Sequence, residues 1–231
     1  MTDHTTHSGF LPRLFNIRRH FGNFSFLLIA LLFLMLSHPL VRGAKQGEII
    51  TLGFTLAFLA GLYALRGEKK TLRTGVILII PAILGSWAYL LSSTGWIITL
   101  GRICQAVFFV YVTFVILRYV LTETEITNDT IWGAMCAYIL IGVVFALIYS
   151  WIEWSYPGSF RGITAAESRA TWEFIYFSLV TMTTLGYGDI VPVHESARSL
   201  ATIEAILGQF FVAVLVARIV AVLAMQPRKH S

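Results

Sequence analysis

This chain consists largely of apolar segments that are each long enough to cross a membrane. A transmembrane helix needs about 20 predominantly apolar residues, and we expect six such helices. They lie at residues 23–41, 47–65, 73–92, 96–120, 131–152 and 197–225. Charged residues make up only 13% of the 231 residues, whereas soluble domains carry about 25%. The sequence therefore predicts an all-α membrane protein.

A further apolar segment, at residues 170–182, is too short to cross a membrane and is followed by a glycine-rich stretch. Non-helical backbone at membrane depth is tolerated only where protein buries it or where it lines a water-filled path. We therefore expect a re-entrant helix between the fifth and sixth transmembrane helices, followed by a loop that lines such a path.

The loop has a composition that suits the binding of a dehydrated cation by backbone oxygens. Its sequence is Thr183-Thr184-Leu185-Gly186-Tyr187-Gly188-Asp189. Four such loops around one axis can present rings of carbonyl oxygens that replace the water shell of K⁺. Aiming successive carbonyls in one direction requires unusual backbone angles, which Gly186 and Gly188 reach without a Cβ clash. Thr184 can add a hydroxyl oxygen at the inner end, and Tyr187 places a ring behind the ion path.

The segment Val180–Pro192, which contains this loop, resembles the selectivity filter of the tetrameric potassium-channel family over its whole length. The resemblance is specific over roughly residues 130–226. It implies K⁺ binding at residues 184–188 and a pore domain made of an outer helix, a pore helix, the filter and an inner helix. The family usually has valine where this chain has Leu185. Because the ion meets the backbone carbonyl there, we expect selectivity to survive and the packing behind the filter to differ.

The resemblance also suggests which residues support the filter. Asp189 matches an acid that steadies the outer end of the filter, and Tyr176 aligns with the tryptophan that is its frequent partner. A second acid found on the pore helix of some relatives aligns with Val180, so we expect a filter that is braced differently. Thr183 and Glu204 complete the predicted set of supporting residues.

Glu204 is the least expected residue of the last apolar segment, because a carboxylate inside a membrane is costly and is a functional candidate by default. One hypothesis is a hydrogen bond to Ser178, Thr181 or Thr183 that braces the filter. The other is a proton-sensitive site. Substitution by glutamine should leave selectivity intact and alter gating or its pH dependence.

The same segment contains Gly208, which lies where the family places a hinge in the inner helix. Glycine costs roughly 1 kcal/mol in a helix interior relative to alanine, so its presence indicates either bending or close packing of small residues. Gln209, Val212 and Val216 are spaced to share one face of the helix, and we expect them to line the cavity below the filter.

The chain has one filter motif and no internal repeat, so a four-fold filter implies a homotetramer, with assembly with a related subunit as the open alternative. The four helices before the pore resemble the layout of voltage-gated channels. A voltage sensor needs arginines about every third residue of one helix, but the fourth segment has only Arg102 near its start and Arg118 near its end. We therefore expect weak voltage dependence or none.

Basic residues cluster at residues 13–19, 66–73 and 228–229, which places both termini in the cytoplasm by the positive-inside rule. Arg42 and Lys45 are exceptions. We therefore expect the protein to lie in the lipid bilayer of the cell membrane, and the topology gives its organisation. It comprises a cytoplasmic segment at 1–22, a four-helix domain at 23–122, a pore domain at 123–226 and a short cytoplasmic tail at 227–231.

Several other classes of function are not favoured. The basic residues lie at the ends of apolar segments, which argues against nucleic-acid binding, and Cys104 and Cys136 lie inside apolar segments without metal-ligand spacing. No nucleophile–base pair or phosphate-binding loop indicates an enzyme, and we expect no cofactor beyond permeant K⁺ and no soluble regulatory domain. The alternatives left open are a channel that passes Na⁺ and K⁺ alike, and a non-conducting accessory subunit.

Overall fold

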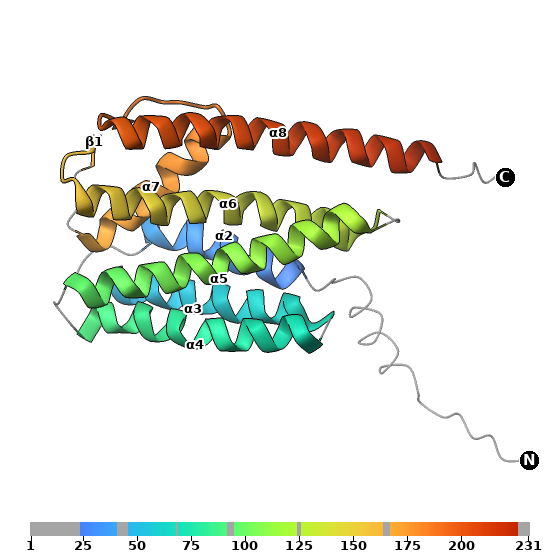
Figure 1. Cartoon of the computed structure of the whole chain (residues 1–231), viewed down its shortest axis with the longest axis horizontal. Coiled ribbons are helices and arrows are strands. Elements are labelled where there is room, and N and C mark those ends of the chain that lie inside the picture. The colour runs from blue at the N-terminus through green and yellow to red at the C-terminus, as the bar shows by residue number, and fades with distance from the viewer. Residues whose placement is uncertain are drawn as a thin grey trace, which may run out of the picture.

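The computed structural model describes residues 24–40, 46–67, 69–91, 95–123, 126–163 and 167–225, and these are mostly helical (Figure 1). The helices are α2 (Ser25–Leu40), α3 (Gln46–Ala64), α4 (Lys69–Leu91), α5 (Gly95–Thr122), α6 (Asn128–Ser155), α7 (Glu167–Met182) and α8 (Glu195–Met225). A short 3-10 helix, η1 (Leu65–Gly67), follows α3, and two short strands, β1 (Phe160–Arg161) and β2 (Val191–Pro192), flank α7.

Within the described residues, five helices are long and apolar enough to cross a membrane. They are α3, α4, α5, α6 and α8. The helix at the first predicted span, α2, has only 16 residues, fewer than the 20 or so that a crossing needs. The fold is therefore that of a helical membrane protein, whereas the predicted count of six spans stays a prediction.

The helices α4 and α5 contact each other at two glycines. A Cβ added at Gly85 would lie 2.3 Å from the Cα of Gly101, so the two backbones are in direct contact there. Small residues that let backbones touch are typical of helix contacts in membranes. Aromatic rings fill the neighbouring core, where Phe58 of α3 lies 5.2 Å from Phe108 and 4.9 Å from Phe109 of α5 between ring centroids.

The start of α6 is fixed by its capping residues. The hydroxyl of Thr127 accepts from the backbone N–H of Thr130, and the Thr130 hydroxyl accepts from the backbone N–H of Thr127. This reciprocal arrangement satisfies N–H groups that a helix start leaves unpaired. Asp129 accepts from the backbone N–H of Phe24 at 3.1 Å, which ties the start of α6 to the start of α2.

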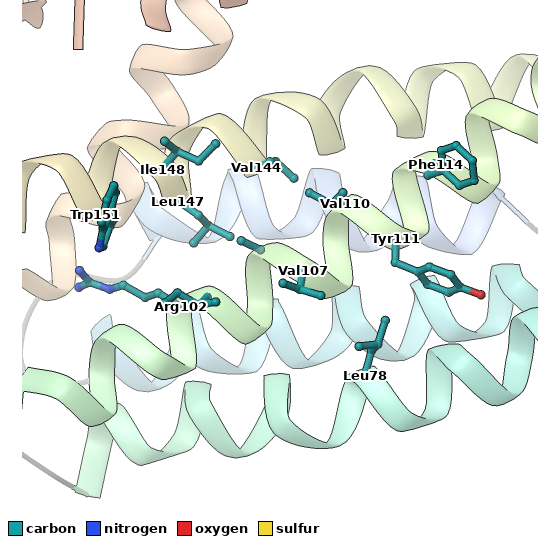
Figure 2. Close-up of a pocket in the computed structure, with 12 residues that line it drawn as sticks. Leu78, Arg102, Val107, Val110, Tyr111, Phe114, Val144, Leu147, Ile148 and Trp151 are labelled. Carbon is teal, nitrogen blue, oxygen red and sulfur yellow. The ribbon is translucent and has the colours of Figure 1, made fainter. Parts of the chain in front are cut away.

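An apolar groove of about 680 Å³ lies between α5 and α6, and Figure 2 shows the residues that line it. Arg102 extends toward Trp151 at one end of the groove (Figure 2). Tyr111 lies toward the other end, where its hydroxyl donates to the Thr71 carbonyl at 3.0 Å. Between these ends the lining is aliphatic and aromatic, so the middle of α5 carries no charge on this face.

The last helix, α8, has little cover from its own chain. In Figure 1 it lies along one side of the molecule, and α7 crosses between it and the other helices while contacting both α6 and α8. In an apolar 18-residue window of Glu195–Val222 only 6% of the residues are buried, and the large side chains of Ile203, Phe210 and Val220 are exposed. An apolar surface that runs along the whole length of a helix must be covered by lipid or by another protein chain.

Candidate functional site

The loop after α7 has a backbone that alternates in handedness. Thr184, Gly186 and Gly188 have positive φ values of 59°, 55° and 78°, and in the described part of the chain Thr184 is alone among non-glycine residues in having one. Such a conformation costs of order 1–3 kcal/mol for a non-glycine residue and persists only where surrounding structure holds it. Alternation of this kind turns successive carbonyls toward one side, whereas residues of an ordinary strand alternate between two sides.

The end of α7 holds this loop from behind. The backbone N–H groups of Leu185 and Gly186 both donate to the carbonyl of Val180, at 3.0 and 3.4 Å. Thr183 donates to the carbonyl of Leu179 through its N–H at 3.0 Å and through its hydroxyl at 2.7 Å. The position of α7 therefore sets the position of the loop, and the negative end of the helix dipole faces the same region.

The outer end of the loop is held by the pair that the sequence suggests. The hydroxyl of Tyr176 donates to Asp189 at 2.7 Å, and Asp189 also accepts from the backbone N–H of Ile190 at 3.0 Å. The hydrogen bond from Tyr176 is the main reason why the pKa of Asp189 lies below its usual value. A charged Asp189 is thus the form that this arrangement stabilises.

A second contact at the outer end comes from the segment between α6 and α7. Strand β1 pairs with β2, and Gly162 lies so close to the loop that an added Cβ would be 2.0 Å from the carbonyl oxygen of Asp189. Glu153 shapes the turn before β1 by accepting the N–H groups of Gly158 and Phe160 at 2.8 and 3.0 Å. Sequence reasoning missed these residues, because glycines and one acid in a polar connection do not reveal a contact with a distant loop.

Behind the loop, Glu204 of α8 is fully buried among hydroxyl groups. The hydroxyl of Tyr149 on α6 donates to one carboxyl oxygen at 2.6 Å, and the hydroxyl of Ser178 on α7 contacts the other. Of the three partners of Glu204 that we predict from the sequence, Ser178 is the one that contacts it in the structure. Thr181 instead donates to a carbonyl of its own helix at 2.8 Å. The sequence analysis missed Tyr149. The available signal was that a tyrosine within an apolar segment needs a hydrogen-bond partner for its hydroxyl.

The inner helix meets the end of α7 at Gly208. A Cβ at this position would lie 2.8 Å from the carbonyl oxygen of Met182, the last residue of α7. The side-chain amide of Gln209 donates to the same oxygen at 3.4 Å. This contact agrees with close packing, one of the two roles expected for the glycine. Val212 and Val216, on the face predicted to line a cavity, are both exposed on the single chain.

The loop itself is uncovered within one chain. All of residues 183–189 are exposed, and Leu185 and Tyr187 have relative exposures of 55% and 66%. The loop therefore combines a strained backbone, contacts with α7 and with Gly162, and two large side chains that the chain itself leaves exposed. It presents backbone carbonyls, and within the described residues no group of three or more histidine, cysteine or acidic side chains could hold a metal ion.

Comparison with known proteins places these elements among ion channels. Residues 134–225, which include α7, the loop and α8, match the family described as "Ion channel". The chain is 32% identical over 76 residues to the potassium channel protein kcv of Paramecium bursaria Chlorella virus 1, of which it covers 79%, using 32% of its own length.

Two larger relatives match over smaller parts of their length. The inward rectifier potassium channel Kirbac3.1 of Paramagnetospirillum magnetotacticum is 35% identical over 81 residues, which are 33% of this chain and 24% of the relative. The two-pore potassium channel 4 of Arabidopsis thaliana is 29% identical over 106 residues, which are 45% of this chain and 37% of the relative. This chain thus spans well under half the length of these two relatives. The family match, the similarity to the viral relative and the apolar helices together show that the chain belongs to the potassium channel family.

Proposed function

We propose that this integral membrane protein is a K⁺-selective channel subunit whose filter is formed by residues 184–188. The observation that carries the proposal is the alternating backbone of Thr184, Gly186 and Gly188, anchored to the end of α7. Carbonyl oxygens turned to one side can replace the hydration shell of K⁺. The ion is then the transported substrate, and the chain acts as a channel and not as an enzyme.

The complete channel in this proposal is a homotetramer. One chain supplies one filter strand, and both the loop and α8 expose apolar side chains that neighbouring chains would cover. In the tetramer, Gln209, Val212 and Val216 would face the axis below the filter, where the ends of four α7 helices offset the cost of moving a cation through the membrane core.

The organisation that we propose around this pore follows the sequence. Residues 123–226 form the pore domain, residues 23–122 form a collar of helices, and residues 1–22 and 227–231 lie in the cytoplasm of a cell whose membrane holds the tetramer. Weak voltage dependence is part of the proposal. Its support is that Arg102 lies at one end of the groove along α5 (Figure 2), and Arg118 lies near the end of the same helix.

The first test is the reversal potential of the purified protein in a bilayer with K⁺ on one side and Na⁺ on the other. We expect a value near the K⁺ equilibrium potential. A value near zero with clear current would support the alternative of a channel that passes Na⁺ and K⁺ alike, and would draw attention to Leu185. Silence in every condition would favour a non-conducting accessory subunit.

Matched glycine variants make the test specific to the filter. Gly186→Ala forces an L side chain to adopt a φ of 55°, so we expect it to lose K⁺ selectivity or current. Gly67→Ala adds the same methyl group where nothing lies within 4 Å and φ is ordinary, so we expect unchanged selectivity. Equal behaviour of the two variants would argue against residues 184–188 as the filter.

A further inference from the structure

Three short oxygen–oxygen contacts meet at the buried junction of α6, α7 and α8. The Tyr149 hydroxyl lies 2.6 Å from Oε2 of Glu204, and Oγ of Ser178 contacts Oε1 of Glu204. The same Oγ lies 2.7 Å from the carbonyl oxygen of Gly142. The side chains of Tyr149, Ser178 and Glu204 are all fully buried, so water from bulk solvent does not take the place of any of these contacts.

A count of protons decides the state of this junction. Each hydrogen bond needs one proton between its two oxygens, so three contacts need three protons. Tyr149 and Ser178 supply one proton each, and the carbonyl of Gly142 supplies none. We infer that Glu204 carries the third proton, and that it works as a neutral hydrogen-bond donor that positions the pore helix.

With the carboxyl group protonated, every contact has a donor and an acceptor. Tyr149 donates to Oε2 of Glu204, the protonated Oε1 donates to Ser178, and Ser178 donates to the carbonyl of Gly142. If Glu204 were a carboxylate, Ser178 could donate to only one of its two neighbours. The other contact would then bring two lone-pair oxygens together without a proton, within a site from which water is excluded.

The charges around Glu204 agree with a neutral group. The titratable side chains that face it are Tyr149 and Tyr138, both on α6, and phenols are uncharged at neutral pH. From α7 it meets the hydroxyl of Ser178, and α8 is its own helix. In the part of the chain that the structure describes, these partners include no basic side chain, and a carboxylate without a counter-ion is costly inside a membrane.

The proton has a short structural path to the loop that we propose as the filter. Ser178 lies two residues before Val180, whose carbonyl accepts the N–H groups of Leu185 and Gly186. Loss of the proton from Glu204 would leave Ser178 able to bond either to Glu204 of α8 or to Gly142 of α6 but not to both, so the last turn of α7 would be less firmly held. Glu204 is thus a positioning residue for the filter, a role that rests on the proposed channel function.

The protonation state is tested directly by infrared difference spectroscopy of the reconstituted protein at neutral pH. We expect a carbonyl stretching band of a buried, protonated carboxylic acid that is absent in Glu204→Gln. Glu153→Gln is the matched control, because Glu153 accepts two backbone N–H groups at the surface and its removal should leave the band unchanged. If Glu204→Gln does not fold, Ser178→Ala should shift the same band by removing its hydrogen-bond partner. Absence of the band in the folded wild-type protein would overturn the inference.

Electrical recordings test the positioning role. Glutamine offers both a donor and an acceptor, so Glu204→Gln should keep the K⁺ selectivity and open probability of the wild type at neutral pH. Alkaline pH should change the open probability of the wild type by about fivefold, the equivalent of one hydrogen bond, and leave that of Glu204→Gln unchanged. Glu204→Ala removes the donor altogether. If Glu204→Gln and Glu204→Ala had the same open probability at neutral pH, the donor role of Glu204 would be refuted.

The proposed channel function and the inferred protonation of Glu204 can be refuted separately. A carboxylic acid band in a protein with no K⁺ selectivity would refute the proposed function and leave the protonation inference standing. K⁺-selective current without the band would refute the inference and leave the function standing.

Discussion

The contact between Gly162 and Asp189 gives a prediction that the structure makes quantitative. Gly162 has a φ of +96°, and an added Cβ would lie 2.0 Å from the carbonyl oxygen of Asp189. Gly158, in the same connection, has a φ of +87° and nothing within 4 Å of an added Cβ. The two glycines therefore share the backbone constraint and differ in the steric one, so the pair of alanine variants separates the two effects.

Alanine at either position pays for a left-handed backbone, which costs about 1–2 kcal/mol per residue. At Gly162 the methyl group also overlaps a backbone oxygen, and overpacking of this kind costs typically 1–3 kcal/mol more. We expect Gly158→Ala to lower the free energy of unfolding by about 1–2 kcal/mol and Gly162→Ala by about 2–5 kcal/mol. Denaturant unfolding of the purified protein in detergent, followed by circular dichroism, measures both.

The same pair of variants tests the link between this contact and the proposed filter. To relieve the overlap, the backbone at Asp189 must move, and Asp189 directly follows the filter. We expect Gly162→Ala to reduce the K⁺/Na⁺ permeability ratio in bilayer recordings and Gly158→Ala to leave it close to the wild-type value. If Gly158→Ala and Gly162→Ala lost the same stability and had the same permeability ratio, the steric contact between Gly162 and Asp189 would be refuted.

Three further predictions concern the remaining parts of the site. Tyr176→Phe removes the hydrogen bond that lowers the pKa of Asp189; because that bond stabilises the charged form, its contribution is present above the ordinary pKa and lost as the pH falls. The variant should therefore lose current at a higher pH than the wild type during acidification, and an unchanged acid profile would contradict this. Gly208→Ala should lower the free energy of unfolding by up to about 2 kcal/mol, since an overpacking cost of about 1–3 kcal/mol against Met182 is offset by a helix-propensity gain of about 1 kcal/mol; a stabilised variant would instead favour a hinge without packing. Recordings at stepped membrane potentials should show little change in open probability, and steep opening with several gating charges per subunit would disprove the weak voltage dependence that we propose.

Much of the site was predictable because the determining interactions are local. Glycine at positions 186 and 188 is required by left-handed backbone, and the structure has positive φ at both. The pairing of Tyr176 with Asp189 was also predicted, although from the resemblance to a family and not from composition. The capping of α6 by Thr127 depends on residues within one turn, so it too could be read from the sequence.

The amino-acid sequence alone shows that the chain is built of apolar helices, because burial of apolar surface and satisfaction of backbone hydrogen bonds leave few alternatives in a membrane. It also shows that a glycine-containing loop follows a helix too short to cross. Which side chains meet across helices, by contrast, depends on how the helices pack. The rotation of α6 places Tyr149 against Glu204, and the path of the connection before α7 places Gly162 against Asp189. Such contacts depend on how distant segments cross and rotate, which the hydrophobic pattern of each segment alone does not specify.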